Sequence, residues 1–177
     1  MRFAEIGLPG AYLVELERRE DERGWFARLW DPNELGAEGL DPRMAQISVA
    51  WNERRGTMRG LHYQADPHGE AKLVRCTRGA IYDVLVDLRP GSPAYTRWVA
   101  VELSDDDPRM LYVPRGVAHG YQTLADGTET LYFISEFYRP ELQRGVRWDD
   151  PAFAIRWPDA DRRVISARDA AWPDFTG

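Results

Sequence analysis

The amino-acid sequence predicts an all-β fold, an antiparallel sandwich or barrel with short peripheral helices, and three observations support this. Short runs that alternate apolar and polar residues recur along the chain, as half-buried strands do. Gly, Pro and Asp separate these runs at short intervals, for example at Arg89–Pro93 and Pro114–Gly116. No helical repeat or low-complexity segment interrupts the pattern. Such spacing is typical of antiparallel sandwiches and barrels.

The first forty residues predict two strands and one helix. After a turn at Leu8–Gly10, residues 11–17 alternate as a strand that ends in a charged run, and a second strand begins at Arg23. Residues 31–35, Asp-Pro-Asn-Glu-Leu, place an N-cap residue, a proline at the first helical position and an acid in the first turn. These signals predict a single short helix.

The rest of the chain continues the strand pattern. Residues 44–52 alternate, which places Gln46 and Ser48 on one polar face that could line a ligand site. Residues 148–173 are rich in Trp, Pro and Asp, and we expect them to pack over the sheets, with a short helix after Ser166. The other predicted strands cover residues 72–77, 80–88, 98–103, 110–113, 119–124 and 130–138.

The composition excludes several classes of protein. The 177 residues are 44% hydrophobic and 29% charged, which excludes a disordered or fibrous chain and fits one domain, residues 1–177. The net charge of −6 argues against a general nucleic-acid or anionic-membrane surface. Because the chain has no long apolar span and no signal-peptide core, we expect a cytoplasmic protein. The single Cys76 excludes an internal disulfide framework and a Cys-rich zinc site.

The stretch from Thr57 to Gly79 carries the first candidate functional residues. It holds Arg59, His62 and Lys72, which supply an anion clamp, a base and a cation beside strand-like segments. If the strand face that carries Lys72 lines a cleft, the ammonium is retained for a bound anion or a reaction, because an unpaired buried charge is costly. The alternative is that Lys72 lies at the mouth of its strand and reaches solvent. Cys76 on the same strand is expected to be a small buried hydrophobe.

A series of short motifs stands along the chain in a specific order. They are Arg23–Phe26, Arg59–Gln64, Lys72–Cys76, Asp83–Arg89, Gly91–Pro93, Val113–Gly120, Trp148–Pro151 and Ser166–Asp169. In this order and spacing the chain resembles the dTDP-4-dehydrorhamnose 3,5-epimerase family almost from end to end. The resemblance implies a cofactor-independent isomerase with a cupin-type jelly-roll fold. It also implies a homodimer that exchanges N-terminal strands, and 4-keto-6-deoxy sugar nucleotides as substrates on the route to dTDP-L-rhamnose.

The resemblance also implies roles for individual residues. By position, His62 resembles the general base, Asp169 its orienting partner and Tyr132 the general acid. The groups around the keto oxygen and the diphosphate are implied to be Lys72, His119 and Arg59. The other implied substrate contacts are Arg23, Phe26, Arg28, Gln46, Ser48, Tyr138, Gln143 and Arg168, of which Tyr138 resembles the aromatic residue that stacks on the thymine base.

The chemistry of such an epimerase explains why these residue types are needed. A C–H proton next to a carbonyl is only weakly acidic, so its removal requires a base near neutral pKa and positive charge at the developing enolate oxygen. Inversion also requires that a proton return from the opposite face of the ring. From composition alone, His62 would be a structural histidine and Tyr132 a core residue, and the resemblance favours the functional interpretation of both.

Four positions depart from the family pattern. Family members usually carry Glu where this chain has Arg28, Asn for Ser48, Glu for Gln143 and Lys for Arg168. All four belong to the substrate-contacting set, while the acid–base set is intact. The loss of two carboxylates and the gain of a guanidinium make the rim more positive, which favours a diphosphate. The dTDP sugar is the first expectation, with a CDP or GDP sugar as the alternative.

Other functions remain as alternatives. A 3- or 5-monoepimerase or a 3,4-ketoisomerase could use the same His, Lys and Tyr. A non-catalytic sugar-nucleotide-binding cupin would need the cleft but not the full catalytic set. A metal-dependent cupin normally has His-x-His, whereas His62 is followed by Tyr63 and Gln64, so we expect no metal. The resemblance implies that no other cofactor is needed.

Overall fold

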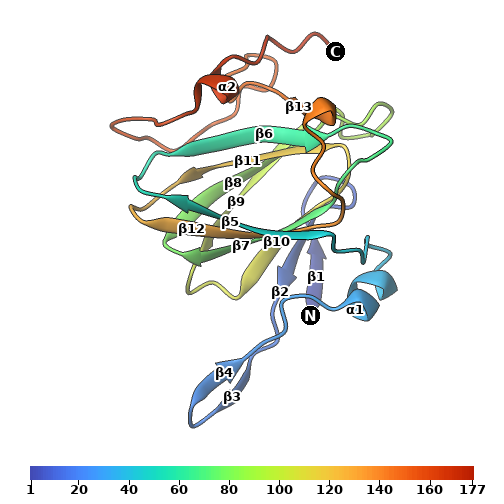
Figure 1. Ribbon diagram of the computed structural model, residues 1–177, viewed down its shortest axis with the longest axis vertical. Helices are drawn as coiled ribbons and strands as arrows, with labels where there is room; N and C mark the ends of the chain where they lie inside the picture. The colour runs from blue at the N-terminus through green and yellow to red at the C-terminus, as the bar shows by residue number, and fades with distance from the viewer.

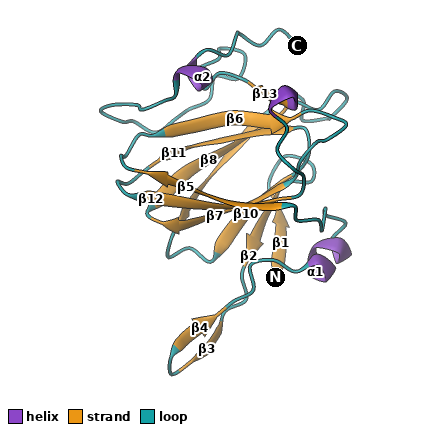
Figure 2. Cartoon of the chain, in the orientation of Figure 1, coloured by secondary structure: helices purple, strands orange, loops and turns teal.

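The computed structural model describes all residues 1–177 and consists mainly of two sheets packed face to face (Figures 1 and 2). The six-stranded sheet has the order β1 (Arg2–Glu5), β2 (Tyr12–Glu15), β10 (Arg109–Val113), β7 (Lys72–Arg78), β12 (Thr128–Ile134), β5 (Gln46–Asn52). The five-stranded sheet has the order β13 (Gln143–Gly145), β6 (Met58–Gln64), β11 (Val117–Thr123), β8 (Ala80–Asp87), β9 (Trp98–Ser104). All pairings are antiparallel, and neither sheet closes into a barrel. The structure is therefore a jelly-roll sandwich, which confirms the all-β prediction.

The remaining elements are short and lie at the periphery. Strands β3 (Arg19–Asp21) and β4 (Gly24–Phe26) form a hairpin that projects away from the sandwich (Figure 1). Helix α1 spans Pro32–Ala37, a 3-10 turn spans Pro140–Leu142, and helix α2 spans Ala167–Ala170. No helix has both the length and the apolar composition needed to cross a membrane. Asp31 caps α1 as predicted, because its side chain accepts from the backbone N–H groups of Asn33 and Glu34.

The strand predictions were correct in the centre of the sandwich and wrong at its margins. The expected charged run before Arg23 contains β3, whose side chains are exposed because this hairpin packs on neither sheet. Strands β1 and β13 were not predicted, since each is short. The strand expected over 130–138 ends at Ile134. Beyond it, the side chains of Gln46 and Gln64, rather than a neighbouring strand, accept from the backbone N–H groups at 138 and 139.

The main core lies between the two sheets and forms the floor of the functional site. Val74, Cys76 and Leu111 contribute from the six-stranded sheet, and Leu85 and Tyr121 from the five-stranded sheet. Cys76 is buried, as predicted, and burial raises the pKa of its thiol to about 12. The thiol is therefore inert at neutral pH.

The outer faces of the two sheets are covered differently. On the five-stranded sheet, Phe153, Ile155 and Trp157 of the C-terminal segment pack over Val84 and Val86, which confirms the expected role of this segment. On the six-stranded sheet, α1 and the N-terminus cover β2, β7 and β10. The outer face of β5 has no such cover, and its Ile47, Val49 and Trp51 are exposed.

Candidate active site

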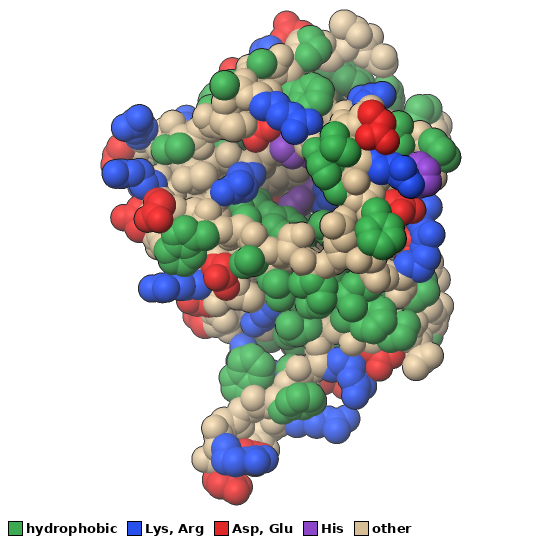
Figure 3. All heavy atoms as spheres, viewed as in Figure 1, with side chains coloured by type: hydrophobic (Ala, Val, Ile, Leu, Met, Phe, Trp, Pro, Cys, Tyr) green, Lys and Arg blue, Asp and Glu red, His purple; other side chains and the backbone are tan.

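A pocket of about 560 Å³ opens between the two sheets. Its walls come from the inner faces of β5, β6, β7, β11 and β12, with β13 and α2 at one rim. Figure 3 shows the hollow on one face of the molecule, with histidine side chains deep inside it. The sequence-predicted residues that line this pocket are Gln46, Ser48, Arg59, His62, Lys72, His119, Tyr132, Tyr138, Gln143, Arg168 and Asp169.

Three other sequence-predicted residues lie outside the pocket. Arg23 belongs to the turn of the β3–β4 hairpin, where it pairs with Asp21 at 2.5 Å. Phe26 and Arg28 line a small cleft beside the N-terminus instead. The fold of one chain therefore does not bring these three residues to the site.

His62 of β6 and Asp169 of α2 form a hydrogen-bonded pair in the pocket wall. Ser166 caps α2 by accepting from the Asp169 N–H at 3.1 Å, and this fixes the carboxylate 2.7 Å from His62 Nε2. Burial raises the pKa of Asp169, but the His62 hydrogen bond and charge, with the Gly60 N–H, lower it more, so the pKa lies below its ordinary value. Because the ionised carboxylate only accepts, Nε2 carries the hydrogen and Nδ1 is left as the base.

Two glycines allow the strands that carry the histidines to approach closely. His62 and His119 are direct partners in the β6–β11 register. A Cβ on Gly120 would lie 2.5 Å from the Arg59 carbonyl oxygen, and one on Gly60, whose φ is +102°, would lie 2.5 Å from the His119 carbonyl oxygen. Only glycine fits at these positions.

The second histidine also has a carboxylate partner. Asp83 of β8 lies 2.6 Å from His119 Nε2, and both side chains are buried. Asp83 was not predicted to be this partner. A signal existed, because a charged residue inside the apolar strand 80–88 needs a buried partner.

Tyr132 is kept protonated by its surroundings. Burial raises its pKa well above the ordinary value, and the neighbouring Tyr121 and Asp83 raise it further. Its ring meets His119 edge-on, with centroids 6.2 Å apart. At neutral pH the phenol can therefore donate a proton or a hydrogen bond. Tyr121 was not foreseen as a pocket residue.

Lys72 lines the pocket and is paired rather than free. Its Nζ lies 2.7 Å from the Glu70 carboxylate, with only 11% and 10% of the two side chains exposed. A second, longer contact of 3.5 Å runs from Nζ to the His62 carbonyl oxygen. The sequence had left open whether the Lys72 ammonium is buried or faces solvent, and Glu70 was not predicted to be its partner.

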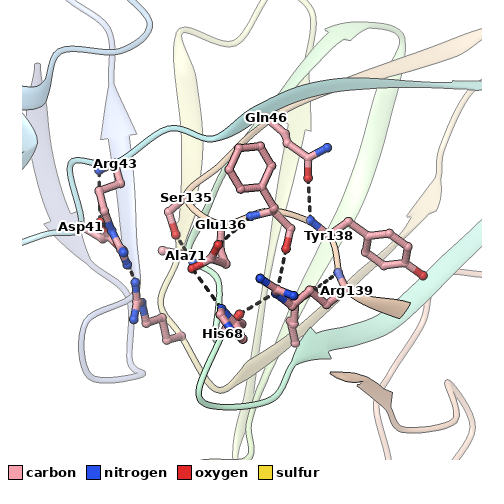
Figure 4. Close-up of polar contacts among 12 residues, drawn as sticks. Asp41, Arg43, Gln46, His68, Ala71, Ser135, Glu136, Tyr138 and Arg139 are labelled. Atoms are coloured by element: carbon pink, nitrogen blue, oxygen red, sulfur yellow. Dashed lines mark hydrogen bonds and ion pairs between the residues drawn. The ribbon is translucent and has the colours of Figure 1, made fainter. Parts of the chain in front are cut away.

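Polar side chains fix the outer rim. The Gln143 amide oxygen accepts from Tyr138 Oη at 2.6 Å and from Arg168 Nη2 at 2.5 Å. Gln46 Oε1 accepts from the Tyr138 backbone N–H at 2.7 Å, as Figure 4 shows. Arg59 donates through Nε to Asn52 and through Nη2 to the Trp51 carbonyl, which leaves Nη1 without a protein partner.

The structure does not assemble the ligand set of a metal-dependent cupin. No group of three or more His, Cys, Asp or Glu side chains comes together. Where such cupins carry their second histidine, this chain has Gln64, whose amide donates to the His68 and Phe137 carbonyls. The pocket's histidines are each engaged by one carboxylate instead.

A jelly-roll sandwich with a His–Asp pair, a lysine and a protonated tyrosine around one pocket defines an acid–base enzyme of the cupin type. A sequence model described as dTDP-4-dehydrorhamnose 3,5-epimerase matches residues 5–177. The chain belongs to this family, and it is therefore a sugar-nucleotide epimerase, an isomerase.

Individual relatives are similar to this chain in sequence and structure over nearly its whole length. The dTDP-4-dehydrorhamnose 3,5-epimerase of Sinorhizobium fredii is 39% identical over 99% of this chain and 90% of its own length. The crystal structure of the Bacillus anthracis enzyme with TDP and PPi bound superposes with a TM-score of 0.93 at 36% identity, covering 98% of this chain and 99% of that one. A 3'-monoepimerase from Streptomyces bikiniensis, in complex with dTDP-quinovose, gives 0.88 at 34% identity, covering 96% and 85%.

Proposed function

We propose that this chain converts dTDP-4-dehydro-6-deoxy-D-glucose to dTDP-4-dehydro-L-rhamnose by inverting C3 and C5 through an enolate. One observation carries the proposal. The His62–Asp169 pair lies on the side of the five-stranded sheet, and a protonated Tyr132 lies on the facing six-stranded sheet, with one pocket between them. Removing a proton on one face of a sugar ring and returning one on the other inverts the stereocentre.

His62 acts as the general base. Its Nδ1 takes the proton from the carbon next to the C4 carbonyl, while Asp169 holds the Nε2–H and stabilises the imidazolium that forms. Lys72 and His119 supply positive charge and hydrogen bonds at the C4 oxygen, where the negative charge of the enolate develops. Tyr132 then donates a proton to the opposite face of the ring, and its raised pKa keeps it protonated between turnovers.

The nucleotide binds at the pocket rim. Arg59, with Nη1 free of protein contacts, and Arg168 are the diphosphate partners, because guanidinium groups match phosphate oxygens in geometry and charge. Tyr138 stacks on the base, and Gln46, Ser48 and Gln143 are further substrate contacts. We favour dTDP over CDP or GDP because most of the family pocket is kept. That the Bacillus anthracis relative binds TDP supports this choice.

The test is to incubate the enzyme in D₂O with dTDP-, CDP- and GDP-linked 4-keto-6-deoxyhexoses and to follow exchange by NMR. We expect exchange at both C3 and C5 of the dTDP sugar. Exchange at one carbon would make the chain a monoepimerase, as the Streptomyces bikiniensis relative is named. A moved carbonyl would indicate a 3,4-ketoisomerase, and binding without exchange a non-catalytic module.

The assignment of His62 is tested by His62→Asn, with His68→Asn as the matched control. Loss of a general base costs on the order of 10²–10⁴ in rate, whereas nucleotide binding should persist. His68 lies in a loop, 3.7 Å from Glu136, outside the pocket lining. Its substitution should leave turnover unchanged. Activity of His62→Asn within about tenfold of wild type would contradict the assignment.

The enzyme works as a homodimer in the cytoplasm. Each protomer consists of a single domain, residues 1–177. Two observations support a dimer. The β3–β4 hairpin projects from the sandwich with Phe26 exposed, and Ile47 and Val49 form an uncovered apolar face on β5. Exchange of the hairpins between protomers would cover apolar surface and bring Arg23, Phe26 and Arg28 to the partner's site.

A further inference from the structure

Three basic side chains of the pocket each have a carboxylate partner. His62 is held by Asp169 at 2.7 Å, His119 by Asp83 at 2.6 Å and Lys72 by Glu70 at 2.7 Å. The first two pairs fix imidazole orientation. The third pair has no imidazole to orient, and it places a carboxylate next to the one ammonium of the pocket.

Glu70 lines the pocket, and the backbone next to it is anchored. It lies two residues before β7, and the adjacent Ala71 is hydrogen-bonded in both directions to Ser135. The Ala71 N–H donates to Ser135 Oγ at 2.8 Å, and the Ser135 N–H donates to the Ala71 carbonyl at 3.0 Å. The backbone that carries Glu70 is therefore anchored beside the six-stranded sheet, and its side chain, only 10% exposed, has little room to move.

The Lys72 ammonium has more N–H donors than the protein provides acceptors. An ammonium has three N–H donors. Glu70 takes one, and the His62 carbonyl oxygen at 3.5 Å is the only other protein acceptor recorded for it. At least one donor is left for a ligand oxygen. Lysine has a long flexible stem, so without an anchor its ammonium would turn toward water at the open side of the pocket.

We propose that Glu70 is a positioning residue that holds the Lys72 ammonium inside the pocket, with a free N–H directed to the substrate's carbonyl oxygen. This inference rests on the proposed function, in which Lys72 stabilises the enolate. A donor that is already in place needs no reorganisation when the charge develops, and this is where enzymes gain most from electrostatics. The carboxylate also lowers the field of Lys72 at that oxygen, and we expect the gain from a fixed ammonium position to exceed this loss.

The experiment compares Glu70→Ala and Glu70→Gln with wild type on the dTDP sugar, reading kcat and KM separately. For Glu70→Ala we expect kcat to fall about tenfold or more, with KM within about threefold, since the contact acts in the transition state. Glu70→Gln keeps an oxygen acceptor for the ammonium and should lose less. The control is Glu136→Gln, another glutamate paired with a basic side chain but outside the pocket lining, which should behave as wild type.

A double-mutant cycle separates positioning from a general structural role. In the Lys72→Ala background, Glu70→Ala should lower kcat by less than about twofold further, because there is no ammonium left to hold. It should also raise the melting temperature of Lys72→Ala, since that variant leaves a buried carboxylate unpaired. Kd for dTDP, measured on each variant, reports folding independently of turnover.

Several outcomes would overturn the inference. A kcat for Glu70→Ala that equals or exceeds that of wild type would show that the carboxylate is dispensable or hinders the lysine. Full multiplication of the two effects in the cycle would show that Glu70 acts independently of Lys72. Absence of exchange in the wild-type enzyme would instead refute the proposed function, so the two failures are distinguishable.

Discussion

Asp169 shows how a single hydrogen bond determines the chemical state of a pocket residue. Its carboxylate is ionised, it accepts from His62 Nε2, and the Ser166 cap of α2 holds it in place. In Asp169→Asn the amide can donate to Nε2, which would move the imidazole hydrogen to Nδ1 and remove the base. We expect kcat to fall on the order of 10²-fold or more with little change in KM, as single-turnover and steady-state assays would show.

Asp174→Asn is the matched control for this prediction. Asp174 is an exposed carboxylate of the same C-terminal segment, 2.7 Å from Arg147, and it does not line the pocket. Equal rates for Asp169→Asn and Asp174→Asn would show that the tautomer of His62 does not depend on Asp169. That result would remove the orienting role that the resemblance implies.

Residue types that carry chemistry could be found from the sequence, but their partners could not. His62, Lys72 and Tyr132 lie in recognisable motifs, whereas Glu70, Asp83 and the tyrosine at 121 gain their roles only through packing. Asp83 meets His119 across the β8–β11 pairing, 36 positions along the chain. The Arg168–Gln143 contact likewise joins α2 to β13, two elements that no sequence pattern places together.

At the scale of the elements, the close spacing of β6 and β11 determines where the two pocket histidines lie. Gly120→Ala would place a Cβ 2.5 Å from the Arg59 carbonyl oxygen, a backbone atom that cannot move aside cheaply. We expect a loss of about 2 kcal/mol or more in unfolding free energy, and a fall in kcat, because His62 and His119 face each other across this pairing. Chemical denaturation measures the first effect and turnover the second.

The control at this scale is Gly36→Ala. Gly36 lies in α1, and a Cβ there would meet nothing within 4 Å. Alanine is favoured over glycine in a helix by about 1 kcal/mol, so this variant should be as stable as wild type or slightly more so. Similar losses in both variants would contradict the steric explanation.

Elements were predictable where the local sequence pattern and burial agree. Strand β8 is a largely apolar run that is buried on both faces, and its predicted bounds differ from the observed ones by one residue. In contrast, β3 is a run of charged residues whose strand pairing depends on β4, and β13 pairs with β6 only because the chain returns to it from residue 140. Such pairing depends on tertiary contacts that periodicity does not encode.

At the scale of the whole molecule, we expect a solution mass near that of two chains at micromolar concentration. Ile47→Asp combined with Val49→Asp should shift the mass toward one chain, because charges would then lie on the face proposed to be buried. Sedimentation velocity measures this directly. Glu38→Lys, an exposed change on the cap of α1, is the control. A one-chain mass for the wild-type protein would contradict the dimer.

The stability of the whole molecule should depend on pH through Asp87, the fully buried carboxylate at the end of β8. Arg89 donates to it through its backbone N–H, Nε and Nη2, and Ser92 donates through Oγ at 2.6 Å. Burial raises the pKa of Asp87, but these hydrogen bonds and the Arg89 charge outweigh burial, so its pKa lies below the ordinary value. A carboxyl with a depressed folded pKa stabilises the protein above its unfolded pKa, about 3.9, and loses that contribution as the pH falls through the folded value.

Asp87→Asn tests this stabilisation, with Asp161→Asn as the control. At pH 7 the Asp87 variant should be less stable by about 2 kcal/mol or more, since Arg89 keeps its charge and loses its partner. The difference should narrow below about pH 4, because wild type then loses the same contribution. Other carboxyls with a lowered pKa, such as Asp107 and Asp169, titrate equally in both proteins, so their contributions to the difference in stability cancel.

Asp161 makes no ion pair, so the stability of its variant should follow that of wild type at every pH in urea titrations. A gap for Asp87→Asn that stays constant down to pH 2 would show that hydrogen-bond geometry, and not ionisation of Asp87, carries the stability.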